Sequence, residues 1–349
     1  MKIALVSTPF LAVPPRDYGG TELVIYELAE GLRGRGHDVT VYATGDSAVS
    51  AHLKWLYPEA QWPPNQFVDV NHATWALSQI VENSFDIVHT NTAPALALTR
   101  LLPEIPMVYT LHHERVDVLS SFYQHFPHVR YVAISEDQRR REVPLPNCTV
   151  IYHGLDPDRY EYTDRHHSYV CFIGRLSRVK GPHIAIDAAV TAGREIRVAG
   201  EVHPVDGDFA IEALNKRFDH PSVVRLGGVG MRAKIELLRD AAALLAPVLW
   251  NEPFGLALIE SMLCGCPVIG FPKGSLPELI EPGVTGYLVN SQEEMVQLIR
   301  PDGELDSFDR VRCRQRATER FGRDTMVQAY AQLYETINAD PRKQIRIWA

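Results

Sequence analysis

Short runs of β-branched and other apolar residues alternate with longer amphipathic stretches along the chain. In the first half, such runs predict buried strands at Ile3–Ser7, Val39–Ala43, Asp86–Thr90, Met107–Leu111 and Tyr131–Ile134. Residues with helical spacing separate these runs, for example over Thr21–Arg33. The alternation is typical of a parallel sheet with helices on both of its faces.

The same alternation begins again after a linker-like segment, His153–His167. Here the expected strands are Tyr169–Ile173, Ile196–Ala199, Val223–Leu226, Ala243–Pro247, Val268–Phe271 and Tyr287–Val289. The chain of 349 residues is also longer than one domain of ordinary size. We therefore predict an α/β protein with two doubly wound, Rossmann-like domains, in residues 1–155 and 156–322. The stretch Phe308–Ile337 has helical spacing, and residues 323–349 are expected to form a C-terminal helix and tail that packs back on the first domain.

Charge and hydropathy exclude several classes of protein. A net charge of −8 leaves no basic surplus to neutralise a nucleic-acid backbone. The longest unbroken apolar run, Ala241–Trp250, is far shorter than the ~18 residues that a membrane-spanning helix needs. The first residues fit a strand better than a signal peptide. The five cysteines are odd in number and lie mostly in apolar segments, which indicates free core thiols of a cytoplasmic protein.

Doubly wound sheets bind their ligands beyond the carboxyl ends of the strands, and two such sheets can face one central cleft. Two acids, Glu252 and Glu260, follow an expected strand of the second half. If a helix begins near Gly255, Glu252 lies in the loop before it and Glu260 about one and a half turns along it, so both can border one pocket. The N–H groups of Phe254, Gly255 and Leu256 would then offer a site for an anion or a hydroxyl group. A helix cap followed by a solvated glutamate is the alternative.

A second candidate segment, Phe172–Gly181, ends the first strand of the second half. Its cations Arg175 and Lys180 stand five residues apart beside glycines at a strand-to-helix turn, which suits a diphosphate. Ordinary surface cations in a solvated turn are the alternative. Arg178, between them, is expected to be solvated.

The first half contributes a Gly19–Gly20 pair before a helix and His112 at the end of a strand. The glycines let backbone amides approach a phosphate or a sugar, although a simple tight turn is also possible. The absence of a Gly-x-Gly-x-x-Gly pattern disfavours a dinucleotide site and hence a dehydrogenase. His112 is followed by His113, and a structural histidine is the alternative for either. The Arg139–Arg141 run is interpreted as mainly solvated, with an acceptor or diphosphate contact as the minority interpretation.

These segments resemble the retaining glycosyltransferases of family four, also called glycosyl transferases group 1. The stretch from Glu252 to Ile269 is similar to the family's donor signature, Glu-x-Phe-Gly-Leu-x-x-x-Glu-(Ala/Ser)-Met. Phe172–Gly181 resembles its Gly-Arg-Leu-x-x-x-Lys-Gly motif, and Thr110–Glu114 its Thr-x-His-(Asp/Glu) segment. The resemblance covers nearly the whole chain and is thinnest between about residues 47 and 85, where an acceptor pocket is expected to vary.

The resemblance implies a GT-B fold and transfer of a hexose from a nucleoside-diphosphate sugar, by default UDP-glucose, to a small-molecule or glycan acceptor. Transfer would retain the anomeric configuration and need no metal or other cofactor. The catalytic residues implied are His112, Arg175, Lys180 and Glu252. The donor-binding residues implied are Gly19, Gly20, Arg175, Lys180, Glu252, Phe254, Gly255, Leu256 and Glu260. In this assignment the two cations bind the diphosphate, Glu260 binds the ribose, Glu252 and the amides bind the sugar, and His112 contacts the sugar from across the cleft.

Two other functions would keep the same fold. One is a sugar-nucleotide epimerase or reversible synthase, and the other is a non-catalytic module that binds a nucleotide sugar. Release of nucleotide with formation of a glycosylated product distinguishes transfer from binding, and a product formed without an acceptor would support epimerisation. No His, Cys, Asp and Glu set has the spacing of a metal site.

Overall fold

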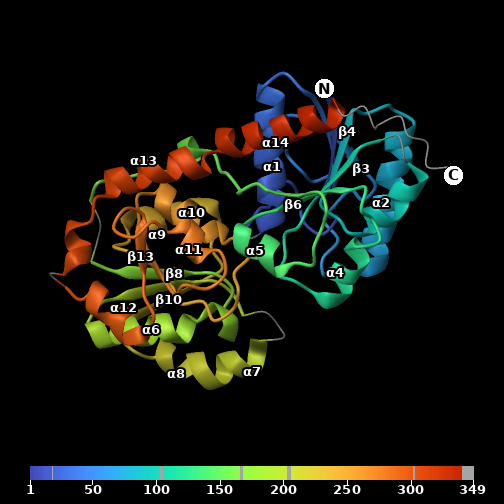
Figure 1. Cartoon of the computed structure of the whole chain (residues 1–349). Helices are drawn as coiled ribbons and strands as arrows, with labels where there is room; N and C mark the ends of the chain where they lie inside the picture. The colour runs from blue at the N-terminus through green and yellow to red at the C-terminus, as the bar shows by residue number, and fades with distance from the viewer. Residues whose placement is uncertain (18, 103–104, 166–167, 203–205, 302, 340–349) are drawn as a thin grey trace. The chain divides into compact units, whose positions relative to one another are not determined.

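The computed structural model of the chain describes residues 1–339, apart from 18, 103–104, 166–167, 203–205 and 302 (Figure 1). The chain divides into two compact units. The first takes Met1–Gly154 together with the segment from Arg323 on, and the second takes Leu155–Gly322. Each unit is built around its own parallel sheet.

The first sheet has seven strands in the order β3-β2-β1-β4-β5-β6-β7, and every pair is parallel. The strands are β1 Lys2–Val6, β2 Asp38–Ala43, β3 His52–Trp55, β4 Ile87–Thr90, β5 Met107–Thr110, β6 Arg130–Ala133 and β7 Cys148–Val150. From β1, which lies between β2 and β4, the chain first builds outward to β3 and then returns to add β4 on the other side of β1. This reversal of strand order is the place where doubly wound sheets bind ligands.

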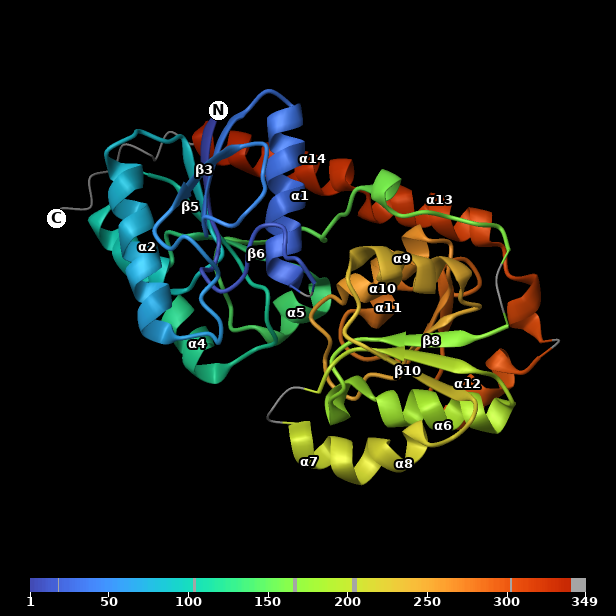
Figure 2. The ribbon, with the colours of Figure 1, turned by 180° about the vertical axis from the view of Figure 1, so that it is seen from behind.

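Helices cover both faces of this sheet. On one face, α2 (Gln66–Val81) and α3 (Pro94–Leu98) pack on a core that includes Tyr42, Tyr109 and Tyr131. On the other, α1 (Gly20–Gly34) runs beside α14 (Arg323–Asn338), as both views show (Figures 1 and 2). The remaining helices of the unit are α4 Asp117–Tyr123, α5 Glu136–Arg141 and the 3-10 turn η1 Thr99–Leu101.

The second sheet has six parallel strands in the order β10-β9-β8-β11-β12-β13. They are β8 Val170–Ile173, β9 Ile196–Ala199, β10 Val223–Gly227, β11 Leu244–Ala246, β12 Val268–Gly270 and β13 Gly286–Leu288.

Figure 2 shows one group of helices below this sheet and a second group above it. Those below are α6 Pro182–Ala192, α7 Gly207–Phe209, α8 Asn215–Phe218 and α12 Gln292–Ile299. Those above are α9 Met231–Asp240, α10 Leu256–Leu263, α11 Leu276–Leu279 and α13 Arg310–Phe321. Shorter turns complete the unit: η2 Pro157–Arg159, η3 Arg178–Lys180, η5 Ala210–Leu214 and η6 Glu304–Ser307.

The predicted fold class is confirmed, and every predicted strand is present with its ends shifted by one or two residues at most. The strands β3 and β7, which lie at the two edges of the first sheet, were not predicted. The predicted helical stretch Phe308–Ile337 is two helices, α13 and α14, that are separated at Gly322.

The five cysteines are free thiols, and all but Cys148 are buried in the second unit, as predicted. In the part of the chain that the structure describes, no helix is long and apolar enough to cross a membrane.

Candidate functional site

The two predicted motifs of the second unit meet where β8 and β11 end. These strands are neighbours in the sheet, so the loops that follow them leave the same edge. Gly181 has φ of 73°, and a Cβ atom there would lie 2.1 Å from the carbonyl oxygen of Pro247. Gly274 fits in the same way against Glu252, where a Cβ atom would lie 2.3 Å from the backbone nitrogen. Glycine is therefore required at both positions for the loops to pack this closely.

Lys180 and Glu252 are joined directly by their side chains. The Lys180 ammonium group contacts Oε2 of Glu252 and lies 4.7 Å from the centroid of the Trp250 ring. The Trp250 indole N–H donates to the same carboxylate oxygen at 2.9 Å. Within the described residues, Oε1 of Glu252 has no hydrogen-bond partner, although the residue is buried. A polar ligand group can therefore bind at Oε1 without displacing either partner.

Glu260 lies on α10, and its side chain is only 4% exposed. Its Oε1 lies 2.5 Å from the Lys234 ammonium nitrogen and accepts a second hydrogen bond from the Tyr160 hydroxyl at 3.2 Å. The alternative of a solvated helix glutamate is therefore wrong for this residue. Lys234 and Tyr160 were missed, because a lysine on an amphipathic helix and a tyrosine in a linker-like segment carry no sequence signal for this contact.

The helix α10 begins at Leu256, directly after Gly255, whose φ is 90°. The first N–H groups of a helix have no partner within it, so this turn can donate hydrogen bonds to a ligand. The side chain of Phe254 is buried and packs edge-on against Phe321, with ring centroids 6.2 Å apart. Its carbonyl accepts from the Ser275 hydroxyl at 2.7 Å, which fixes the loop before the helix.

Arg175 and Arg178 differ in their surroundings. The Arg175 side chain is 41% exposed and lies 3.5 Å from the Asp206 carboxylate. Arg178 is 62% exposed, with its guanidinium over the Phe209 ring and 3.9 Å from Glu212. This placement agrees with the expectation that Arg178 is solvated.

In the first unit, His112 follows β5 and is oriented by Asn91, which follows β4. The Asn91 side-chain NH₂ group donates to the Val6 carbonyl at 3.1 Å, so its Oδ1 faces Nε2 of His112 at 2.8 Å. Nε2 must therefore carry the proton, and Nδ1 is left with a lone pair. The His112 ring also stacks on that of His153, with centroids 5.4 Å apart. Burial, and then the nearby His153 and His113, hold the pKa of His112 well below its usual value, so the ring is neutral.

His113 is occupied within its own unit. Its Nδ1 donates to the Glu114 carbonyl at 2.7 Å, and its Nε2 accepts from the Tyr123 hydroxyl at 2.8 Å. No ring nitrogen remains for a ligand. Of the two adjacent histidines, the geometry leaves a ring nitrogen of His112 available.

The Gly19–Gly20 pair lies at the start of α1, which begins at Gly20. A Cβ atom on Gly19 would lie 2.8 Å from side-chain atoms of both Leu11 and Pro15, so packing also requires glycine here. The buried Glu22 carboxylate accepts from the Thr8 hydroxyl at 2.7 Å and ties the loop to the end of β1. Burial raises the pKa of Glu22 above its usual value.

The structure also describes the Arg139–Arg141 run and the possible metal-binding side chains. Arg139 and Arg141 lie on α5 and pair with Glu136 and Asp137 at the exposed surface, in agreement with a mainly solvated role. Among the described residues, no group of three or more His, Cys, Asp and Glu side chains has an arrangement that could hold a metal ion.

Comparison with known protein families gives two adjacent matches. Residues 163–320 match the model of the "Glycosyl transferases group 1", and residues 18–159 match that of "Glycosyltransferase Family 4". Together the two matches cover the second sheet and all strands of the first sheet except β1, which precedes residue 18.

Among similar proteins, an uncharacterised 41.2 kDa protein of the cps region of Klebsiella pneumoniae is 29% identical over 170 residues, about half of either chain. N-acetyl-alpha-D-glucosaminyl L-malate synthase of Bacillus anthracis is 24% identical, over 93% of this chain and 96% of its own. The structure of Anabaena HepE in complex with UDP-glucose is similar with a TM-score of 0.75 and 21% identity, and the match covers 96% of this chain and 100% of that one.

Proposed function

Because the chain belongs to glycosyltransferase family 4, the glycosyl transferases of group 1, we propose that it moves a hexose from a nucleoside-diphosphate sugar to an acceptor hydroxyl. The reaction retains the anomeric configuration and uses no metal ion. UDP-glucose is the default donor, and the similarity to a structure that contains this compound supports the choice. The acceptor, a small molecule or a glycan, binds to the first unit.

The observation that carries this proposal is the convergence of the two motifs at one edge of the second sheet. Lys180 from the Phe172–Gly181 segment contacts Glu252 from the segment that follows β11. Glu260 lies on α10, the helix that follows Glu252. Cations, carboxylates and the N–H groups at the start of α10 suit a ligand that is anionic at one end and rich in hydroxyl groups elsewhere. A nucleoside-diphosphate sugar has both properties.

The chemistry assigned to the site follows from these charges. Arg175 and Lys180 stabilise the charge that develops on the leaving diphosphate, the work that a divalent ion does elsewhere. Glu260 binds the ribose, and Glu252 binds sugar hydroxyls through its open Oε1. The contact with Glu252 holds the Lys180 ammonium group at the strand end until the donor phosphate binds.

Retention follows in this proposal from a reaction on one face of the sugar. The bond between the anomeric carbon and the diphosphate oxygen breaks, and a bond to the acceptor oxygen forms on the same face. The acceptor proton passes to the departing diphosphate oxygen, so no separate general base is needed. The neutral His112 ring accepts a hydrogen bond from the donor sugar at Nδ1, in keeping with the family resemblance.

A thermal-unfolding screen with UDP-, GDP- and ADP-sugars tests donor binding. A ligand at 100 times its dissociation constant adds ~2.7 kcal/mol of apparent stability if it binds only the folded protein. We expect one nucleotide class to stabilise the protein, and Arg175→Ala to reduce that effect, whereas the exposed control Arg232→Ala should not. Release of nucleotide and sugar from the stabilising donor then tests turnover. Stabilisation without turnover would instead support a binding module, and no stabilisation by any donor would contradict the proposal.

A further inference from the structure

Glu260 and its two partners form an arrangement with one carboxylate oxygen saturated and the other open. Both the Lys234 ammonium group and the Tyr160 hydroxyl bind Oε1. Among the described residues, Oε2 of Glu260 has no hydrogen-bond partner. This oxygen is not sealed inside the protein and is therefore open to solvent. An oxygen that solvent reaches and no side chain occupies can accept a hydrogen bond from a ligand hydroxyl without displacing Lys234 or Tyr160.

Lys234 has the least exposed side chain of the five charged residues of α9, followed by Asp240 at 26% and Arg239 at 28%. Its side chain is 15% exposed, whereas that of Arg232 on the same helix is 94% exposed and pairs with Glu236 at the surface. Burial of an ammonium group requires a charged partner, and Glu260 is the partner that the structure gives it. Lys234 is thus held in place by the carboxylate that it orients.

We propose that Lys234, assisted by Tyr160, is a positioning residue that fixes the Glu260 carboxylate with Oε2 turned toward the ribose hydroxyls of the donor nucleotide. The inference rests on the proposed function, which assigns the ribose contact to Glu260. The terminal torsion of a glutamate side chain is broad, so a carboxylate without these partners samples many orientations. Two donors on one oxygen select a single orientation. The preference of the site for ribonucleotides over deoxyribonucleotides therefore depends on Lys234.

The test measures binding of UDP and of 2′,3′-dideoxy-UDP, which lacks both ribose hydroxyls, with the corresponding adenine and guanine pairs run in parallel. For the unsubstituted protein, we expect the ribonucleotide to bind about 10- to 150-fold more tightly, the range of one charged hydrogen bond. In Lys234→Met the ratio should fall to about threefold or less, mainly through weaker binding of UDP. Lys234→Arg keeps the charge and should restore a part of the ratio.

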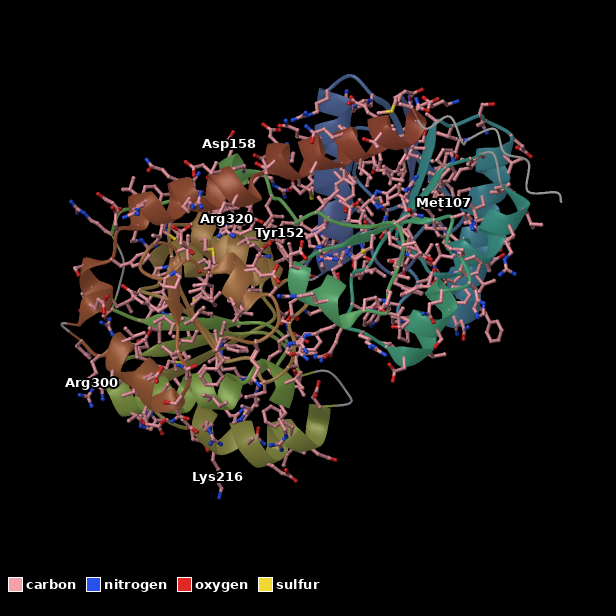
Figure 3. All side chains as sticks on the ribbon, viewed as in Figure 1. Met107, Tyr152, Asp158, Lys216, Arg300 and Arg320 are labelled. Atoms are coloured by element: carbon pink, nitrogen blue, oxygen red, sulfur yellow. The ribbon has the colours of Figure 1, made fainter. Side chains whose placement is uncertain are left out.

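Lys216→Met is the matched control, because Lys216 lies on α8 and its exposed side chain points away from the fold (Figure 3). It should keep the ratio of the unsubstituted protein. Tyr160→Phe removes only the hydroxyl and should lower the ratio by a few-fold, so it provides the test even if Lys234→Met does not fold.

Three results would overturn the inference. If both Lys234→Met and Tyr160→Phe keep the affinity ratio of the unsubstituted protein, the orientation of Glu260 does not depend on Lys234 or Tyr160. Equal weakening of UDP and the dideoxy form would mean that Lys234 acts on the diphosphate or only on folding. If the unsubstituted protein binds none of the uracil, adenine and guanine pairs, the proposed function fails, and the inference fails with it.

Discussion

The side-chain carbonyl of Asn91 accepts a hydrogen bond from Nε2 of His112 at 2.8 Å, and this bond decides which ring nitrogen of the histidine is open. The Asn91 amide cannot be turned around, because its NH₂ group donates to the Val6 carbonyl. His112 therefore presents a lone pair at Nδ1, and its lowered pKa keeps the ring neutral near pH 7. A group of this kind accepts a hydrogen bond from a hydroxyl group and does not attract a phosphate.

Replacement of Asn91 by alanine should release His112 and lower kcat/KM for the donor. The loss of one neutral hydrogen bond predicts a decrease of about 2- to 13-fold. The measurement is steady-state release of nucleotide, with Asn71→Ala, an exposed residue of α2, as the control. If kcat/KM is unchanged in Asn91→Ala, the orientation of His112 has no part in turnover and the residue is structural.

The Lys180–Glu252 contact predicts that the effects of the two residues on kcat are not additive. Lys180→Ala should lower kcat by roughly 10²-fold, as expected for loss of one preorganised donor to developing negative charge. Glu252→Ala should also lower kcat, but less in the Lys180→Ala background, with a coupling of about 0.5–3 kcal/mol. Kinetics of the single and double variants give this value. A coupling near zero would mean that the contact in the ligand-free protein has no part in the reaction.

Metal independence is tested by adding excess EDTA to the reaction. Arg175 and Lys180 supply positive charge at the diphosphate in the proposed mechanism, so the turnover rate should stay unchanged. The same assay with added magnesium or manganese is the control. Activity that EDTA abolishes and either ion restores would contradict this part of the mechanism.

His89 joins the first sheet to the C-terminal helix α14 inside the first unit. Its ring nitrogens lie 2.7 Å from the Tyr334 hydroxyl and 2.7 Å from the Thr110 hydroxyl. Burial lowers the pKa of His89 to about 3 and that of His153 to about 3, and it lowers the pKa of His72 to about 4. All three side chains are thus buried in the neutral form.

Because these pKa values are lower in the folded state than in the unfolded chain, the unfolded state binds more protons below pH ~6.5. The contribution of these histidines to the free energy of unfolding is therefore fully present above that pH and is lost as the pH falls toward 4. Each such histidine costs about 1 kcal/mol at pH 5.5 relative to pH 7.5. Urea unfolding of the first unit at the two pH values measures the loss, and His89→Gln should reduce it, whereas His52→Gln, with a side chain 79% exposed in the native protein, should not. Equal midpoints at both pH values would show that these histidines are not buried neutral.

The sequence was sufficient to predict the strands whose residues are buried on both faces. It failed for the edge strand β3, whose exposed ends His52 and Trp55 leave no apolar run, and for the edge strand β7, where Thr149 is exposed and its two neighbours are only half-buried. The candidate residues Glu252 and Lys180 were found because a motif places each beside a strand end. Their contact was not, because it joins residues 72 positions apart.

Residues that act through a neighbour were not predictable from the sequence. Asn91 and Lys234 become significant only when folding sets them beside His112 and Glu260, and neither belongs to a motif. Between about residues 47 and 85, where the family resemblance is weakest and an acceptor pocket was expected, the tryptophans differ in their surroundings. Trp55 is 50% exposed there, but Trp75 packs edge-on against Tyr42 with ring centroids 5.9 Å apart, so Trp75 belongs to the core of the first unit.

The central claim is that the protein transfers the sugar of a nucleotide donor with retention of configuration. Water can replace the acceptor, so the most direct measurement is proton NMR of the sugar first released from UDP-glucose, or from the donor that the binding screen selects. Spectra are recorded before the two anomers interconvert, with the Lys180→Ala variant as the control. The account predicts that the α-anomer of the α-linked donor appears first and that Lys180→Ala slows its release. The β-anomer as first product would contradict the account, and so would the absence of any release from a donor that binds.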